Sequence, residues 1–234
     1  MTTHCDIAPF AARNNTQPPV RLGQRYDAHR FLPEAGNTVV CHLDRTAPTH
    51  SAVLRARAQM MALPGASGFL FTPEDSLHMT LFEGVLDTRR TQDAWPRDLD
   101  LSAPVTETTN VLQRRLAGFS PLRTFTMRAV GLLPTGLTLA GSDDSNDEIA
   151  RLWRDALTEP FGYRHHDHDA YRFHISFAYP VTWLSDSALP VWKAEIPQIL
   201  GELVETTPTL PLCAPAFCTF SDMCHFKETL GLGG

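Results

Sequence analysis

The chain has 234 residues, of which 43% are hydrophobic and 20% charged, so it can bury a sizeable core as one large domain or two small lobes. Its formal net charge of −6, with histidine neutral, excludes a protein that wraps nucleic acid through an extended basic surface. A polyanionic partner must therefore meet a local basic site, which suits a small phosphate ester better than a long duplex.

The predicted elements follow from hydrophobic periodicity and from the positions of proline and glycine. In chain order we expect an irregular arm over 1–20, a strand over 37–43, a helix over 49–63, a strand over 77–85, a charged connection over 87–107, a helix over 109–119, strands over 124–133 and 136–140, a helix over 145–159, a polar loop over 162–170, a strand over 172–179, a helix over 190–205 and further strand segments over 210–220. This order predicts an α+β fold in which hairpins alternate with helices.

Local signals mark the ends of these helices. Thr49 and Ser145 are plausible N-caps, and Pro160 is expected to follow the helix over 145–159. Pro190 fits the first turn of the helix over 190–205, whereas Pro197 is expected to kink or interrupt it.

The cysteine pattern and the N-terminal sequence indicate the cellular compartment. The five cysteines include no C-x-x-C pair, which argues against a disulfide framework or a zinc ribbon. The N-terminus lacks the pattern of a signal peptide, and no apolar run is long enough to cross a membrane. We therefore expect a cytoplasmic protein without a membrane partner.

Two strands carry the same polar tripeptide, His78-Met79-Thr80 and His174-Ile175-Ser176. Side chains two residues apart in a strand share a face, so each strand divides into a polar and an apolar face. The polar faces hold Ser76, His78 and Thr80 in the first strand and Arg172, His174 and Ser176 in the second. With ten histidines in the chain, about one such tripeptide is expected by chance, so the matched setting in both halves carries the argument.

The pairing of imidazole with hydroxyl predicts phosphoryl chemistry. Two imidazoles on opposite sides of a phosphorus atom could act as general base and general acid in one displacement. Thr80 and Ser176 could donate hydrogen bonds to phosphoryl oxygens, and Arg172 could add a positive charge. The scheme requires no metal and no cofactor.

These motifs resemble those of the two-histidine (2H) phosphoesterase superfamily, which includes RNA 2′,3′-cyclic phosphodiesterases and 2′,5′ RNA ligase-like proteins. The resemblance rests on residues 77–82 and 173–178. It implies two pseudo-symmetric lobes of antiparallel sheet with helices outside, in one domain around a central cleft. It also implies that His78 and His174 form the acid/base pair, that Thr80 and Ser176 bind the phosphate, and that RNA ligase-like activity is within the family's range.

A second resemblance is local. Arg25-Tyr26-Asp27 and the segment 31–43 are similar to the N-terminal signature of an uncharacterised bacterial and fungal branch of that superfamily. The branch implies no substrate, and Tyr26 and Asn37 receive no role from it.

Other polar residues admit more than one interpretation. His165, His166 and His168 suggest a solvated loop, the border of the cleft or a metal site. His42 could line the cleft, but a hydrogen-bonded strand histidine is the favoured interpretation. Tyr179 falls on the apolar face by alternation, as a packing residue.

The sequence thus leaves three functional hypotheses. The first is a metal-independent phosphodiesterase that acts on a cyclic phosphate or an RNA-end phosphodiester. The second is a module that binds a nucleotide or RNA end without turnover. The third is a metal-dependent hydrolase built on His165, His166 and His168.

Overall fold

The computed structural model describes residues 5–233. Its seven-stranded sheet has the order β4-β5-β6-β3-β1-β8-β9, and every neighbouring pair is antiparallel. The strands are β1 Gly36–His42, β3 His78–Leu86, β4 Met127–Leu133, β5 Gly136–Gly141, β6 His174–Ser176, β8 Ala216–Phe220 and β9 Lys227–Gly231. A separate ribbon pairs β2 Phe69–Phe71 with β7 Ala178–Pro180. The predicted α+β class is confirmed.

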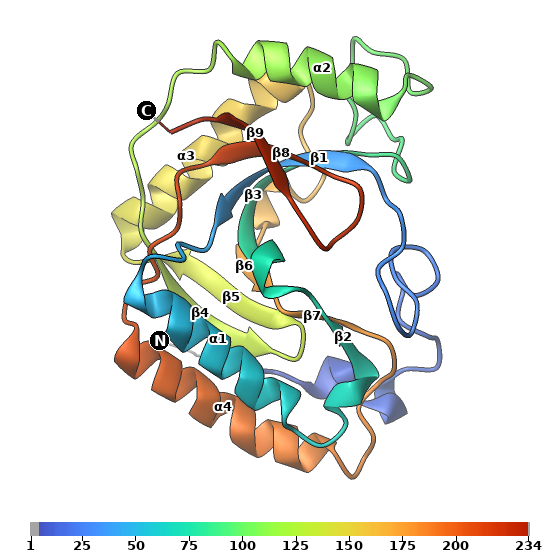
Figure 1. Cartoon of the computed structure of the whole chain (residues 1–234), viewed down its shortest axis with the longest axis vertical. Coiled ribbons are helices and arrows are strands. Elements are labelled where there is room, and N and C mark those ends of the chain that lie inside the picture. The colour runs from blue at the N-terminus through green and yellow to red at the C-terminus, as the bar shows by residue number, and fades with distance from the viewer. Residues whose placement is uncertain (1–4, 234) are drawn as a thin grey trace.

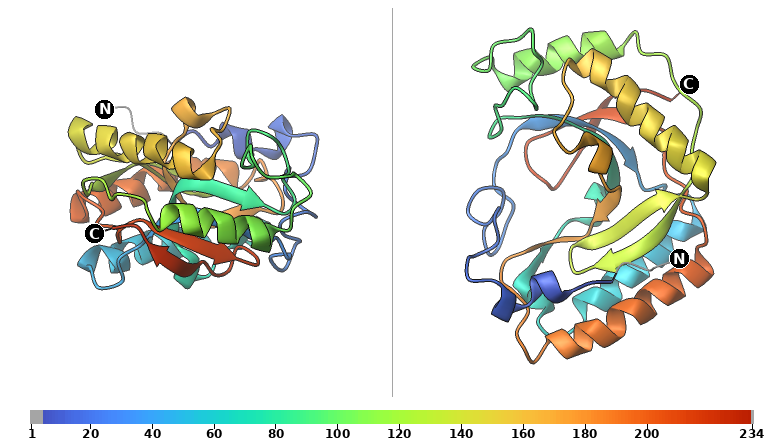
Figure 2. Two further views of the ribbon diagram at one scale, coloured as in Figure 1. Left: turned by 90° about the horizontal axis from the view of Figure 1, so that it is seen from above. Right: turned by 180° about the vertical axis from the view of Figure 1, so that it is seen from behind.

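Four α-helices flank the sheet: α1 Pro48–Met61, α2 Val105–Leu116, α3 Asp144–Phe161 and α4 Leu189–Thr206. Figure 1 shows α2 and α3 at one end of the molecule and the neighbouring pair α1 and α4 at the other, with the strands between them. Seen from behind, the β4–β5 hairpin lies between α3 and the α1–α4 pair (Figure 2). The apolar faces of the helices therefore cover both halves of the sheet.

The strands of both halves join in one continuous sheet through β3 and β6. The two pseudo-symmetric lobes that the family resemblance implies remain a prediction. The contact between β3 and β6 is short, because β6 has three residues and Met79 pairs with Ile175 alone. This junction is where the two motifs meet.

Helix ends differ from the predicted ones in their chemistry. The N-cap of α1 is Ala47 and not Thr49. The N-cap of α3 is Asp143, whose side chain accepts from the amide of Asn146, so the prediction of Ser145 was wrong. Asp143 fits because a carboxylate satisfies orphan N–H groups and favours the positive end of the helix dipole.

Two prolines, Pro160 and Pro197, lie inside helices that they were expected to follow or to interrupt. Pro160 lies inside the last turn of α3, which ends at Gly162 in a left-handed conformation (φ 72°). Pro197 lies inside α4, which runs without interruption from Leu189 to Thr206. The α4 helix tolerates this proline because burial of its apolar face against the core outweighs the lost hydrogen bond.

The predicted strand over 172–179 is divided. Its first part is β6, and its second part, β7, leaves the main sheet to pair with β2. The predicted strand segment over 210–220 is a strand only from Ala216 onward. Hydrophobic periodicity does not predict β2 or β9, because β2 is short and β9 carries exposed polar residues.

The N-terminal arm lies along the molecule. Of the expected arm over 1–20, residues 1–4 lie outside the described residues. The rest includes two single turns of 3₁₀-helix, Ala8–Phe10 and Ala12–Asn14. Ala11 is fully buried, and the amide of Ala12 donates to the carbonyl of Leu184. Within residues 5–233, no helix combines the length and apolar character that a membrane crossing needs.

Candidate active site

The two predicted motifs line one pocket. It comprises about 650 Å³ of space that protein atoms leave free, part of it open solvent, and it lies at the junction of β3 and β6. His78, Thr80, His174 and Ser176 all line it. The pocket's remaining polar or charged lining residues are Arg25, Asn37, Thr38, Thr72, Ser76, Glu83, Arg89 and Tyr179.

The register of β3 against β6 explains why the four residues converge. Met79 pairs with Ile175 in an antiparallel contact, and both side chains are fully buried. The flanking residues of an antiparallel pair face each other crosswise, so His78 lies opposite Ser176 and Thr80 lies opposite His174. All four point to the face away from the core, and each imidazole therefore stands across from the other motif's hydroxyl.

The two imidazoles are held in the same way. The Nδ1 atom of His78 lies 2.6 Å from the carbonyl oxygen of Ser76, and that of His174 lies 2.9 Å from the carbonyl oxygen of Arg172. A carbonyl only accepts, so Nδ1 carries the hydrogen in both rings. In the neutral ring Nε2 then keeps a free lone pair, which is the form that a general base requires.

The surroundings of the two rings differ. His174 is exposed, whereas His78 is partly buried beneath Phe226, whose ring centroid lies 4.1 Å away. Burial, with smaller contributions from the nearby His42 and His174, lowers the pKa of His78 to about 3, although the hydrogen bond to the carbonyl of Ser76 opposes the fall. His78 is thus neutral at neutral pH.

Glu83 enters the pocket through a β-bulge. Val39 and Val40 of β1 pair with Phe82 and Thr80, which leaves Leu81 as an extra residue in β3. Leu81 and Phe82 are consequently both buried, and Glu83 turns to the same side as Thr80. Strict alternation would have placed Glu83 on the core face. Bulges next to functional sites commonly redirect side chains in this way.

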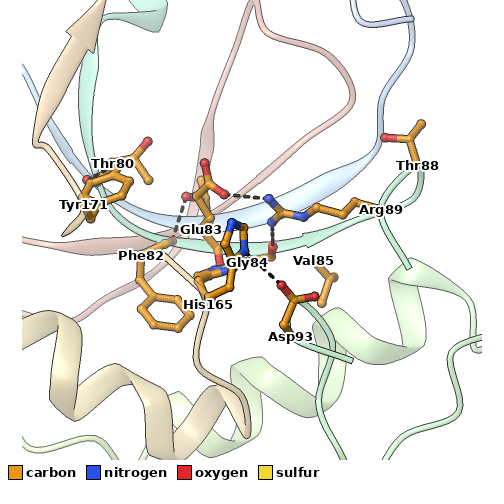
Figure 3. Close-up of polar contacts among 12 residues, drawn as sticks. Thr80, Phe82, Glu83, Gly84, Val85, Thr88, Arg89, Asp93, His165 and Tyr171 are labelled. Atoms are coloured by element: carbon orange, nitrogen blue, oxygen red, sulfur yellow. Dashed lines mark hydrogen bonds and ion pairs between the residues drawn. The ribbon is translucent and has the colours of Figure 1, made fainter. Parts of the chain in front are cut away.

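Side chains satisfy the carbonyl groups around the bulge, where β6 no longer pairs with β3. The bonds are those of Tyr171 Oη to Thr80 O (3.3 Å), Arg154 Nη1 to Leu81 O (2.6 Å), Thr38 Oγ1 to Phe82 O (3.0 Å), and Tyr163 Oη and His165 Nε2 to Glu83 O (3.0 and 2.8 Å). Four consecutive carbonyls are thereby fixed, which holds the backbone of Glu83 in place. Figure 3 shows two of these side chains, Tyr171 beside Thr80 and His165 below the Glu83 backbone.

The carboxylate of Glu83 forms an ion pair with Arg89, with 2.7 Å between Oε2 and Nη1. Arg89 also donates to the carbonyl of Gly84, so its guanidinium bridges the Glu83 side chain and the Gly84 backbone (Figure 3). Burial alone would raise the pKa of Glu83, but Arg89, with help from His165 and Arg25, holds it below its ordinary value. The pocket therefore contains a fixed, ionised carboxylate.

A second charged pair lies near Ser176. Arg25 lies 2.6 Å from the buried carboxylate of Glu34, and Arg25, Tyr179 and Ser176 line the pocket together. Burial raises the pKa of Tyr179, although the neighbouring Arg25 and Ser176 oppose the rise. The Tyr179 hydroxyl is therefore close to both of these groups.

Tyr179 is a packing residue, as expected, because it packs against a small buried cluster and its ring centroid lies 5.2 Å from that of Tyr26. It also lines the pocket, because the strand over 172–179 breaks at Phe177 and the alternation shifts there. Its neighbour Tyr26 is buried and donates to the carbonyl of Pro180 at 2.7 Å. Asn37 is also buried, where its side chain accepts from the amide of Val85 and donates to Thr109.

Arg172 lies outside this group. It is exposed and does not line the pocket, and its contact with the motif is the carbonyl that accepts from His174. The arginines that line the pocket are Arg25 and Arg89. His42 does not line it either, but its ring centroid lies 6.1 Å from that of His78.

The loop histidines do not converge. His165 donates to the carbonyl of Glu83, while His166 contacts Asp93 and His168 contacts Asp155. His165 and His168 are buried, so the expectation of a wholly solvated loop was wrong. Across residues 5–233, no three His, Cys, Asp or Glu side chains gather so as to hold a metal ion. The separate partners remove the geometric basis for a metal centre on these three histidines.

An apolar wall faces the polar lining. Phe220 of β8 and Met223 and Phe226 of the β8–β9 connection line the pocket together with Leu86. The rings of Phe220 and Phe226 lie 4.9 Å apart. Figure 1 shows this connection projecting from the sheet toward the centre of the molecule. The pocket thus offers flat apolar surface beside its charged groups, as small-molecule sites commonly do.

Comparisons with known proteins agree with this geometry. Residues 25–138 match the family model 2H-phosphodiest, described as a domain of unknown function (DUF1868). The match includes His78 and Thr80 and ends before His174. A crystal structure of a conserved protein of unknown function from Agrobacterium tumefaciens strain C58 is 43% identical, covers 95% of this chain and 97% of its own, and superposes with a TM-score of 0.93. No curated protein matches.

Proposed function

The chain belongs to the two-histidine (2H) phosphoesterase superfamily, and from this membership we propose that it is a metal-independent phosphodiesterase acting on a cyclic phosphate or an RNA-end phosphodiester. The observation that carries the proposal is the crosswise register of His78 and Thr80 against Ser176 and His174 in one pocket. The two imidazoles and two hydroxyls, on the neighbouring strands β3 and β6, could contact a phosphate group that binds between them.

The proposed reaction is an in-line displacement on a cyclic diester. One imidazole takes a proton through Nε2 from the attacking water, whose oxygen forms a bond to phosphorus. The bond from phosphorus to one ester oxygen breaks, and the other imidazole donates a proton to that leaving oxygen. The product is a phosphomonoester with a neighbouring free hydroxyl. Thr80 and Ser176 donate hydrogen bonds to the non-bridging oxygens, where charge gathers in the transition state.

The different surroundings of the imidazoles assign their roles. His78 is partly buried and neutral, so we take it as the base, and the exposed His174 is left to carry the proton as the acid. A bound phosphate anion beside the ring raises the pKa of His78 toward the range in which an imidazole can accept a proton.

The charged groups of the pocket are paired. Glu34 accompanies Arg25 and Glu83 accompanies Arg89, so the two lining arginines bring no excess positive charge. A phosphodiester is a monoanion, whereas the monoester product carries nearly two charges at neutral pH. A pocket with balanced charge holds the more highly charged product less tightly than a basic cluster would, which aids product release. In this proposal Arg172 lies at the rim, where it can attract the anion but does not contact the phosphate.

The test is turnover of nucleoside 2′,3′-cyclic phosphates and of RNA with a 2′,3′-cyclic end, followed by phosphorus NMR with and without EDTA. We expect conversion to a monoester that EDTA does not slow. Tight binding with recovery of unchanged ligand would instead support a non-catalytic binding module. Loss of turnover in EDTA, restored by a divalent metal, would contradict the two-histidine scheme.

A further inference from the structure

We infer that Glu83 is a specificity-determining residue, whose free carboxylate oxygen accepts a hydrogen bond from an uncharged N–H or O–H donor of the substrate beyond its phosphate. The donor is an amino or imino group of a nucleobase or a hydroxyl of the sugar. This inference rests on the proposed function, because it takes the phosphate to lie between His78 and His174.

The position of Glu83 separates it from the phosphate site. It lies three residues beyond Thr80 on β3, but the bulge at Leu81 takes up one of them. Thr80 and Glu83 pair with Val40 and Thr38 of β1, so they lie two residue steps apart, about 7 Å along the strand. A carboxylate in contact with the phosphate would repel it, but at this distance it faces the neutral part of a nucleotide-sized molecule. Glu83 and Thr80 nevertheless line the same pocket.

One oxygen of the Glu83 carboxylate is free to accept a hydrogen bond from a ligand. Oε2 accepts from Arg89, whereas Oε1 has no hydrogen-bond partner among residues 5–233. The side chain is 46% exposed, so Oε1 is open to the pocket. Figure 3 shows the carboxylate turned away from the sheet, with Arg89 on one side. An ionised acceptor of this kind selects for a donor and against a group that lacks one.

Several contacts from other parts of the chain hold Glu83 in position. The bulge at Leu81 turns Glu83 into the pocket, and Tyr163 and His165 both donate to its carbonyl. Arg89 keeps its carboxylate ionised and fixes its direction. Such support is typical of a residue whose position must be set to within a fraction of an ångström. A surface carboxylate that served only solubility would require none of it.

The opposite wall supplies the rest of a nucleotide-sized site. Phe220 and Phe226 present aromatic surface to the same pocket. A planar base can stack on such surface with little dependence on its identity. Discrimination must then come from hydrogen bonds to the edge of the bound group, and Glu83 is the acceptor with an unused oxygen.

The experiment compares wild type with Glu83→Gln on substrates that share a cyclic phosphate and differ in donors. The set is guanosine, inosine, uridine and N3-methyluridine 2′,3′-cyclic phosphates, a 5′-O-methyl nucleoside analogue, and ethylene cyclic phosphate, which has neither base nor sugar. We expect wild type to lose at least about 10-fold in kcat/KM when the recognised donor is removed, and Glu83→Gln to lose that discrimination. The donor whose removal matters assigns the base or the sugar as its source.

Ethylene cyclic phosphate separates recognition from structure. We expect the ratio of Glu83→Gln to wild-type kcat/KM to be higher on this compound than on substrates that carry the recognised donor, because ethylene cyclic phosphate offers Glu83 no donor. A uniform change on every substrate, matched by Arg89→Gln, would show that Glu83 only anchors Arg89 and would overturn the inference. Asp87→Asn is the matched control, since Asp87 pairs with Arg90 in the same way but does not line the pocket.

Failure of the proposed function has a different signature. If wild type turns over none of these compounds, the same set can be measured as dissociation constants by calorimetry. Discrimination that Glu83→Gln abolishes in binding would support the role of Glu83 without catalysis. Equal dissociation constants across the set in both proteins would overturn it.

Discussion

Met79 and Ile175 lie directly opposite each other in the antiparallel contact of β3 with β6, and both are buried. This pair centres the candidate active site, because the residues on either side of it are the two imidazoles and the two hydroxyls. The buried pair thus fixes the register, and a slip of one residue would turn each motif's polar residues toward the core.

Replacement of either histidine by alanine should abolish most turnover without unfolding the chain. His78→Ala and His174→Ala are each expected to lose at least about 100-fold in kcat, as for a lost acid or base. Circular dichroism and thermal melts should show a folded protein in both cases. His166→Ala is the matched control, since that imidazole is exposed and pairs with Asp93 away from the pocket. Full activity in His174→Ala would refute the two-histidine scheme.

Gly136 should be required for the position of β6. A Cβ atom there would lie 2.0 Å from the carbonyl oxygen of Ile175, and φ is 141°. Gly136→Ala should cost about 2 kcal/mol or more in the free energy of unfolding. It should also lower kcat by about 10- to 100-fold through displacement of His174. Urea titrations and steady-state kinetics test both effects.

Gly201 provides the opposite case. It lies in α4, and nothing stands within 4 Å of a Cβ placed there. Gly201→Ala should therefore stabilise the chain by about 0.5–1 kcal/mol and leave turnover unchanged. A comparable loss of activity in both variants would show that the effect of Gly136→Ala is not local.

Tyr179 should act as a positioning residue for Ser176. Tyr179→Phe removes a pocket hydroxyl that lies near Arg25 and Ser176, and we expect a loss of about 10-fold in kcat/KM, less than a lost direct donor. In a cycle with Ser176→Ala, the two losses should be less than additive. Strict additivity would mean that Tyr179 does not act through Ser176.

Tyr26 is the control for that tyrosine. Its buried hydroxyl donates to Pro180, so Tyr26→Phe should cost about 1–3 kcal/mol in the free energy of unfolding. Its turnover at 25 °C should match wild type, because Tyr26 does not line the pocket.

The buried imidazole of His78 predicts a pH dependence of stability. Its pKa falls from the ordinary 6.5 to about 3 in the folded chain. The stability contribution is complete above pH 6.5 and is lost as the pH falls from 6.5 toward 3, because the unfolded chain binds the proton first. His78→Gln should flatten the fall in unfolding free energy by at most about 1.4 kcal/mol per pH unit in that window. Equal slopes for the two proteins between pH 6.5 and 4 would contradict the lowered pKa.

Sequence predictions succeeded where a feature depends on residues close together in the chain, and failed where it depends on contacts between distant segments. The helices and most strands were predictable, since their apolar periodicity reports burial that the core then enforces. The faces of the two motifs were predictable too, because alternation holds over three residues. Alternation failed at Glu83, where the bulge adds a residue, and at Tyr179, where the strand breaks. An acidic residue at a core position of β3 was the signal that could have exposed the bulge.

The sequence alone determined the α+β class, the two His-x-Thr/Ser strands and the side on which each presents its imidazole. These depend on local backbone geometry and on hydrophobic patterning, which each segment carries by itself. Only the tertiary structure decided that the two strands pair at Met79 and Ile175, and that Arg25 and Arg89 line the pocket while Arg172 does not. Those facts depend on register, on a bulge and on side-chain bonds between distant segments, which no local pattern encodes.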